Sequence, residues 1–162
     1  MREGPHIGWW VIWVTLVAGM MLTIWPLPDW AARFRPDWVA LLVIYWCLAM
    51  PHRVGILTAW VAGVMVDALT GSLLGEHALA LTVVAFLTLQ SHLRLRLFPL
   101  WQQTVSVVAF LVVYQFLLLW IDGITGQVTG SWERLLPVLT SAVLWPWILN
   151  LLRILRRRYQ SV

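Results

Sequence analysis

The sequence contains no lysine, a single cysteine and few charged residues. All eleven basic residues are arginine, and charged residues make up only 11% of the 162 positions. Hydrophobic residues account for 61%, so too few polar side chains remain to cover a water-soluble surface. The chain is therefore expected to be a membrane protein with lipid as its main solvent.

The sequence lacks the residues that several classes of chemistry require. The single Cys47 cannot form an intramolecular disulfide, and it excludes a metal or dithiol site built on cysteines. The sequence has no Ser/His/Asp set on one predicted side of the membrane, no H-E-x-x-H motif and no phosphate-binding loop. The arginines form no continuous basic face with aromatic residues, which argues against a nucleic-acid partner. We therefore expect no enzyme activity, no cofactor and no metal.

Six apolar stretches have, or approach, the length of a membrane-spanning helix. A bilayer core about 30 Å thick needs about 20 apolar residues at a rise of about 1.5 Å each. The predicted spans cover residues 9–25, 38–50, 54–74, 77–93, 97–121 and 135–152. The fold class is thus predicted to be an all-α polytopic membrane protein, a six-helix bundle that forms one integral membrane domain over residues 1–162.

The first two predicted spans are atypical. The first follows Arg2 as a secretory signal would, but it is rich in tryptophan and no A-x-A-like cleavage site follows it closely, so we expect it to be retained. The second reaches only about 20 Å, which means that it begins earlier, near Trp30, or crosses a thinned bilayer.

Short connections at residues 51–53 and 75–76 predict that spans two, three and four are sequential antiparallel neighbours.

The arginines orient the bundle. A cytoplasmic N-terminus leaves three arginines outside, namely Arg33, Arg35 and Arg134. The other eight are then inside: Arg2, Arg53, Arg94, Arg96, Arg153, Arg156, Arg157 and Arg158. This excess obeys the positive-inside rule, so both termini are predicted to be cytoplasmic.

Small residues and one acid recur along the third predicted span. Ala59, Gly63, Asp67, Gly71 and Gly75 are spaced four residues apart, which would place them on nearly one face of a helix. That face is expected to pack closely against another helix. Asp67 is either a structural acid, hydrogen-bonded to donors of an adjacent helix, or a direct contact for a partner protein, because a bare carboxylate inside a membrane is costly.

The last predicted span contains a proline. Pro146 should kink this helix, so that Trp145 and Trp147 project on different sides of the bend. Such kinks are usually structural, although they can open a groove for a partner helix.

Five motifs, in the same order along nearly the whole chain, resemble the rod shape-determining protein MreD family of rod-shaped proteobacteria. They are RPDW at residues 35–38, AMPHR at 49–53, G-x-x-x-D-x-L-x-G-S-x-L-G at 63–75, LWQQ at 100–103 and LWPWI at 144–148. Each is weak alone in an apolar chain. Their shared order and separations make an accidental match improbable.

The resemblance implies a non-enzymatic inner-membrane scaffold of the elongasome, which supports rod shape and lateral peptidoglycan synthesis. Its expected partners are MreC, MreB filaments, RodA with its transpeptidase partner, and membrane lipid. The family also resembles the substrate-binding subunits of energy-coupling-factor transporters in fold. The small-residue face and the kinked last helix would dock partner helices, while the cytoplasmic arginines Arg53, Arg153, Arg156, Arg157 and Arg158 would face filaments or anionic lipid.

The alternative is a small-molecule or lipid-binding subunit of a membrane transporter. Such a protein needs a pocket in which polar and aromatic groups converge. Within the predicted spans the sequence offers Asp67, Gln115 and Asn150 as candidates for that pocket.

Overall fold

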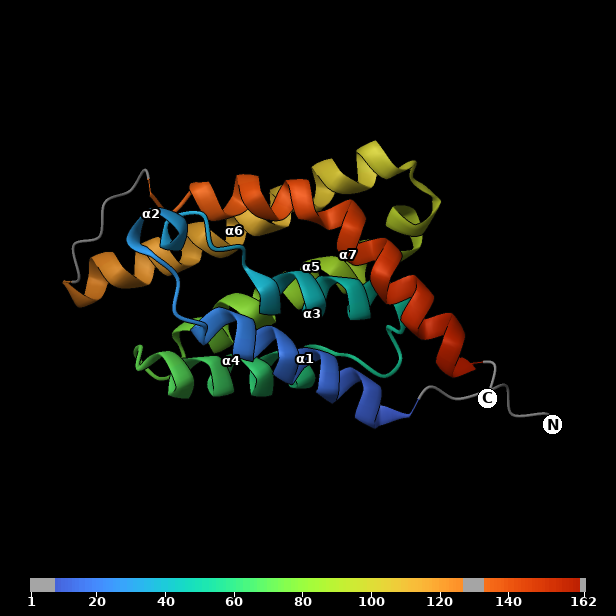
Figure 1. Cartoon of the computed structure of the whole chain (residues 1–162), viewed down its shortest axis with the longest axis horizontal. Coiled ribbons are helices and arrows are strands. Elements are labelled where there is room, and N and C mark those ends of the chain that lie inside the picture. Colours follow the sequence, from blue (N-terminus) through green and yellow to red (C-terminus); the bar gives the residue numbers. More distant parts are fainter. Residues whose placement is uncertain (1–7, 127–132, 161–162) are drawn as a thin grey trace.

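The computed structural model describes residues 8–126 and 133–160 of the chain, so Arg2 and Val162 lie outside the described part. All regular structure in this part is helical, as the apolar runs predict. The helices are α1 (Trp9–Ile24), α2 (Asp29–Ala32), α3 (Trp38–Ala49), α4 (Ile56–Thr70), α5 (Glu76–Leu97), α6 (Leu100–Thr125) and α7 (Leu136–Gln160). They form one elongated bundle (Figure 1).

The helices differ in their reach across a membrane. Three of them, α5, α6 and α7, are long and apolar enough to cross it. The other three apolar helices are shorter, with 16 residues in α1, 12 in α3 and 15 in α4. Each of these six helices overlaps one predicted span, and together they support a helical membrane protein. The count of six crossings stays a prediction.

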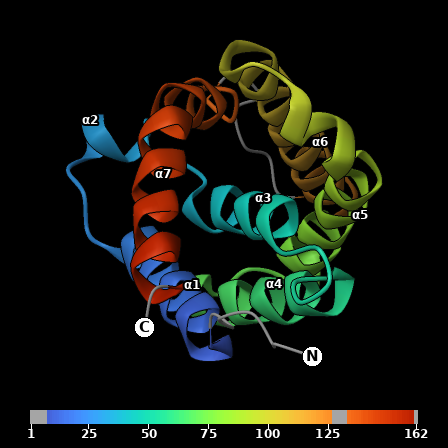
Figure 2. The same ribbon diagram turned by 90° about the vertical axis from the view of Figure 1, so that its right-hand side faces the viewer.

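Helix α3, which the sequence marks as the shortest span, is the centre of the bundle. Ten of its twelve residues are buried, and Figure 2 shows it enclosed by the surrounding helices. A helix that is apolar on every side is suited to such a position. It begins at Trp38 and not near Trp30, because residues 29–32 form the separate helix α2.

The packing order differs in part from the predicted one. Helix α4 packs chiefly against α5, and α5 against α6, as sequential neighbours. The principal neighbours of α3 are instead α5, α1 and α7. The predicted adjacency therefore holds for spans three and four, and it is wrong for spans two and three, because α3 turns into the core and leaves α4 at the periphery.

Helix α7 contains Pro146 and bends near its middle (Figure 1). Trp145, just before the proline, is fully buried, whereas Trp147, just after it, is 73% exposed. The helix continues to Gln160, eight residues beyond the predicted limit of the span. Its last two turns therefore carry the arginine cluster.

Candidate functional site

Gly63 lies where α4 meets the first turn of α5. A Cβ atom at this position would be 2.3 Å from the Cα of Ala78 and 2.5 Å from its N. Those atoms are backbone and cannot move aside without moving α5. The close packing at Gly63 is therefore between two helices of the same chain.

Gly71 and Gly75 do not continue the helical face of Gly63, so their predicted placement is wrong. Helix α4 ends at Thr70, and Gly71 is its C-cap with a φ of 68°. Gly75 is the N-cap of α5 with a φ of 101°. Both adopt left-handed backbone that glycine reaches without steric cost. The four-residue spacing thus arises from one helical contact followed by a tight turn.

Asp67 lies one turn before the end of α4 and is bonded to that turn and to the start of α5. Its carboxylate accepts hydrogen bonds from the backbone N–H groups of Gly75 and His77, at 2.8 and 3.0 Å. The Ser72 hydroxyl donates to it at 2.9 Å. Gly75 has no side chain with which to cap α5, so Asp67 supplies the capping carboxylate from the preceding helix.

His77 completes this arrangement. Its Nδ1 lies 2.7 Å from Oδ1 of Asp67, whose side chain is 0% exposed. The sequence analysis did not select His77 as a site residue. The sequence feature that could have identified His77 is the short turn between Asp67 and His77, because this turn brings the chain back to the Asp67 carboxylate. We call Gly63, Asp67, Gly71, Gly75 and His77 the α4–α5 junction.

A second acid, Asp37, is partly buried and lies just before α3. The Gln115 side-chain amide donates to both of its carboxylate oxygens, at 3.0 and 2.8 Å. The backbone N–H of Asp37 donates to the Ser141 hydroxyl at 3.0 Å. Asp37 thereby ties the start of the central helix to α6 and α7.

Asp37 belongs to the RPDW motif at residues 35–38, and Arg35 of this motif binds the end of α1. Both terminal nitrogens of the Arg35 guanidinium donate to carbonyls at the end of that helix, those of Thr23 and Trp25.

Burial raises the pKa of the Asp37 carboxyl to about 6, while the hydrogen bond from Gln115 and the charge of Arg134 oppose the rise. Asp37 is therefore mainly ionised at neutral pH. The sequence marked RPDW only as part of a resemblance and did not predict this network.

The charges are separated along the bundle. The described acids lie at the end that contains the α4–α5 junction and the start of α3; they are Asp29, Asp37, Asp67, Glu76, Asp122 and Glu133. Three arginines share this end: Arg33 lies 3.9 Å from Glu133, Arg35 precedes Asp37, and Arg134 pairs with Asp122. The other end contains Arg53 in the α3–α4 connection, Arg94 and Arg96 near the end of α5, and Arg153, Arg156, Arg157 and Arg158 in α7.

The hydrogen bonds of Asp37 and Asp67 join helices and turns of the same chain. Over the described ranges, His, Cys, Asp and Glu side chains form no group that could hold a metal ion. A cavity of about 220 Å³ lies beside the start of α3, with Asp37, His77 and Tyr114 in its wall. A second cavity, of about 310 Å³, lies at the opposite end of α3.

A family comparison and a comparison with a single relative point to the same protein family. Residues 5–155 match the family described as rod shape-determining protein MreD. The chain is 31% identical over 150 residues to the rod shape-determining protein MreD of Haemophilus influenzae, and the match covers 93% of each chain. No solved structure matches the chain, so the likeness to substrate-binding subunits of energy-coupling-factor transporters stays a prediction.

Proposed function

Because the chain belongs to the rod shape-determining protein MreD family, we propose that it is a non-enzymatic scaffold of the elongasome in the inner membrane. In this role it supports lateral peptidoglycan synthesis together with MreC, RodA and its transpeptidase partner, and MreB filaments. The family match over nearly the whole chain carries the proposal. The carboxylates of Asp37 and Asp67 support it further, because they bond to the protein's own helices and turns.

The scaffold docks partner helices on α7. Gly63 is already covered by α5, so the small-residue face is not free for a partner. The exposed face of α7 consists of apolar residues at helical spacing: Leu139, Val143, Trp147, Leu151 and Ile154. Buried Trp145 holds the bend of α7 in place, and the scaffold favours the active arrangement of the synthase by binding it more tightly than the inactive one.

Copurification with MreC tests this docking. A tagged Trp147→Ala protein is expected to recover at least about tenfold less MreC than the unchanged protein, because a large exposed aromatic side chain commonly contributes about 2 kcal/mol or more at an interface. Trp120→Ala is the matched control, since Trp120 lies on α6 and is 57% exposed. Equal recovery of MreC with both variants, at matched abundance, would refute docking on α7.

The protein crosses the membrane several times and has both termini in the cytoplasm. All the described acids lie at one end of the bundle and seven of the ten described arginines at the other, which supports this orientation because cytoplasmic loops retain arginine. Reporter fusions after Arg53, Arg96 and Val162 are expected to give a cytoplasmic signal, and a fusion after Gly75 a periplasmic one. A periplasmic signal after Val162 would remove one crossing from this topology.

The second candidate function is a small-molecule-binding transporter subunit. It is favoured by the cavity between Asp37 and His77, where polar and aromatic groups converge. The cavity holds only about 220 Å³, whereas ligand pockets commonly measure about 300–1,000 Å³. Mass spectrometry of the purified protein is expected to find no bound vitamin-sized molecule there, and a stoichiometric one would favour transport.

A further inference from the structure

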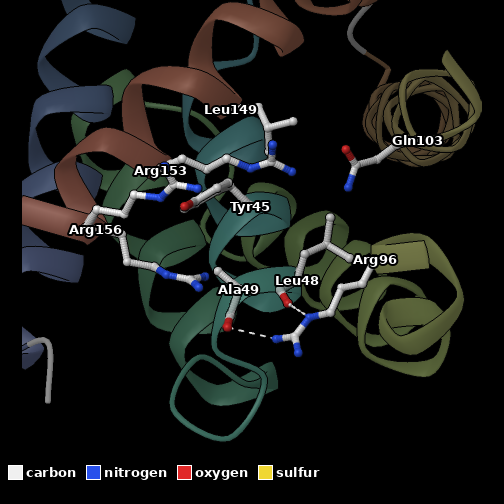
Figure 3. Close-up of a pocket in the computed structure, with 9 residues that line it drawn as sticks. Tyr45, Leu48, Ala49, Arg96, Gln103, Leu149, Arg153 and Arg156 are labelled. Atoms are coloured by element: carbon white, nitrogen blue, oxygen red, sulfur yellow. Dashed lines mark hydrogen bonds between the residues drawn. The ribbon is translucent and has the colours of Figure 1, made fainter. Parts of the chain in front are cut away.

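A cavity of about 310 Å³ opens where α3 ends, at the arginine-rich end of the bundle. The side chains that line it converge from several sides (Figure 3). Tyr45, Leu48 and Ala49 come from α3, Arg96 from α5, Gln103 from α6, and Leu149, Arg153, Arg156 and Arg157 from α7. We call this cavity the arginine pocket.

The arginine pocket is strongly positive. Four arginines line it, and no carboxylate is among its lining residues. The acids of the described ranges lie toward the other end of the bundle. Arg156 and Arg157 follow Arg153 on α7 by three and four residues, so their side chains lie near that of Arg153 and the three like charges repel one another.

Arg96 is held in place by the end of the central helix. Its Nε donates to the carbonyl of Leu48 at 2.6 Å, and one terminal nitrogen donates to the carbonyl of Ala49 at 2.8 Å. These carbonyls belong to the last turn of α3, which has no later residues to satisfy them. Arg96 therefore offsets the partial negative charge of this helix end, while three arginines of α7 remain around the pocket.

Tyr45 points to a missing acceptor. The residue is only 2% exposed, and although Arg156 lies beside its hydroxyl oxygen, the O–H group has no acceptor among the described residues. A buried hydroxyl without a partner costs about 1–3 kcal/mol. An anion in the cavity that Tyr45 lines would accept a hydrogen bond from this O–H group. The same anion would meet the N–H donors of the arginines that line the cavity.

We propose that the arginine pocket binds a phosphate group, either the headgroup of an anionic phospholipid or free phosphate. A guanidinium matches two phosphate oxygens with parallel N–H donors, and several arginines can share one phosphate. The lining also includes the apolar residues Leu48, Ala49 and Leu149, so the carbon atoms next to a headgroup would find an apolar contact there. This contact favours the lipid. The inference does not depend on the scaffold role.

Binding to the purified full-length protein tests the proposal. Native mass spectrometry in detergent would measure retention of phosphatidylglycerol, with phosphatidylcholine and inorganic phosphate as the other ligands. We expect one phosphatidylglycerol per chain to be retained preferentially. The Arg153→Gln/Arg156→Gln protein is expected to bind it at least about tenfold more weakly, because each arginine contributes about 1 kcal/mol or more.

Two further variants separate the pocket from general basicity. Arg94→Gln/Arg158→Gln removes the same charge from residues outside the lining, and its affinity should stay within about twofold of the unchanged protein. Tyr45→Phe deletes only the hydroxyl and should weaken binding about threefold. Unchanged thermal midpoints without ligand would show that each variant folds.

The outcomes distinguish the two sources of phosphate. Retention of phosphatidylglycerol that millimolar phosphate does not displace identifies the lipid headgroup. Displacement by phosphate, with stabilisation of the unchanged protein by phosphate alone, identifies the free anion. Absence of binding by both ligands, or equal weakening by the two double variants, would overturn the proposal and leave only a basic surface.

Discussion

Cells that depend on a Gly63→Ala protein are expected to contain less of it and to lose their rod shape. The added Cβ would lie 2.3 Å from Cα of Ala78 and 2.8 Å from the carbonyl carbon of His77. Both belong to backbone, so α4 and α5 must separate. Overpacking of this kind costs about 1–3 kcal/mol, and here it also displaces the turn that Asp67 holds.

Gly123→Ala is the matched control for Gly63→Ala. Gly123 is also helical, in α6, but a Cβ there would meet no atom within 4 Å. Alanine is a better helix former than glycine by about 0.5–1 kcal/mol, so this variant should be as stable as the unchanged protein or more so. Abundance in membranes and the thermal midpoint in detergent measure both effects. Equal midpoints for the two variants would contradict the close contact at Gly63.

The Asp67→Leu protein is expected to be damaged more severely than any other single variant considered. Leucine fills the buried volume but accepts no hydrogen bond from Gly75, His77 or Ser72. Each buried donor left without a partner costs about 1–3 kcal/mol, and two of the three are backbone N–H groups that cannot turn away. Rounded, poorly growing cells and little recovery of MreC should follow.

Asparagine at position 67 should have an intermediate effect. Its carbonyl oxygen can replace Oδ1, which accepts from Ser72 and His77. Its NH₂ group would face the N–H of Gly75, which now donates to Oδ2, so one bond is lost. We therefore expect Asp67→Asn to support rod shape with a lowered thermal midpoint.

Ala68→Leu controls for the added bulk, because Ala68 is an exposed neighbour on α4. It should behave as the unchanged protein in shape, abundance and recovery of MreC. A carboxylate that paired with a partner arginine would make Asp67→Asn fail as badly as Asp67→Leu. Wild-type behaviour of both Asp67 variants at matched abundance would mean that the junction does not depend on this carboxylate.

The positions of the helices could be predicted from the sequence because each apolar run is local information. Each of the six long apolar runs became a helix, and proline and glycine lie near most of their ends. Helix α4 ends earlier than predicted because Gly71 adopts a left-handed conformation that its spacing did not reveal. Helix α7 extends further because arginine is compatible with a helix beyond the membrane.

The candidate site was predicted in part. Asp67 was selected because a carboxylate among apolar residues needs partners, and its partners are the turn that follows α4 and His77 in the first turn of the adjacent helix α5. The Asp37–Gln115 bond joins residues 78 positions apart, and no local pattern predicts such a contact. The same holds for the arginine pocket, whose four helices meet only in the bundle.

The sequence by itself determined that this protein is helical, resides in a membrane and is related to MreD, since composition, periodic apolar runs and ordered motifs are properties of the chain. Only the tertiary structure decided that the shortest span is the buried centre, that Gly63 serves an internal contact, and that the arginines of α5 and α7 surround one cavity. The physical reason is that apolar residues at a helix surface are equally suited to lipid and to another helix. Which one they contact depends on how all the helices pack together.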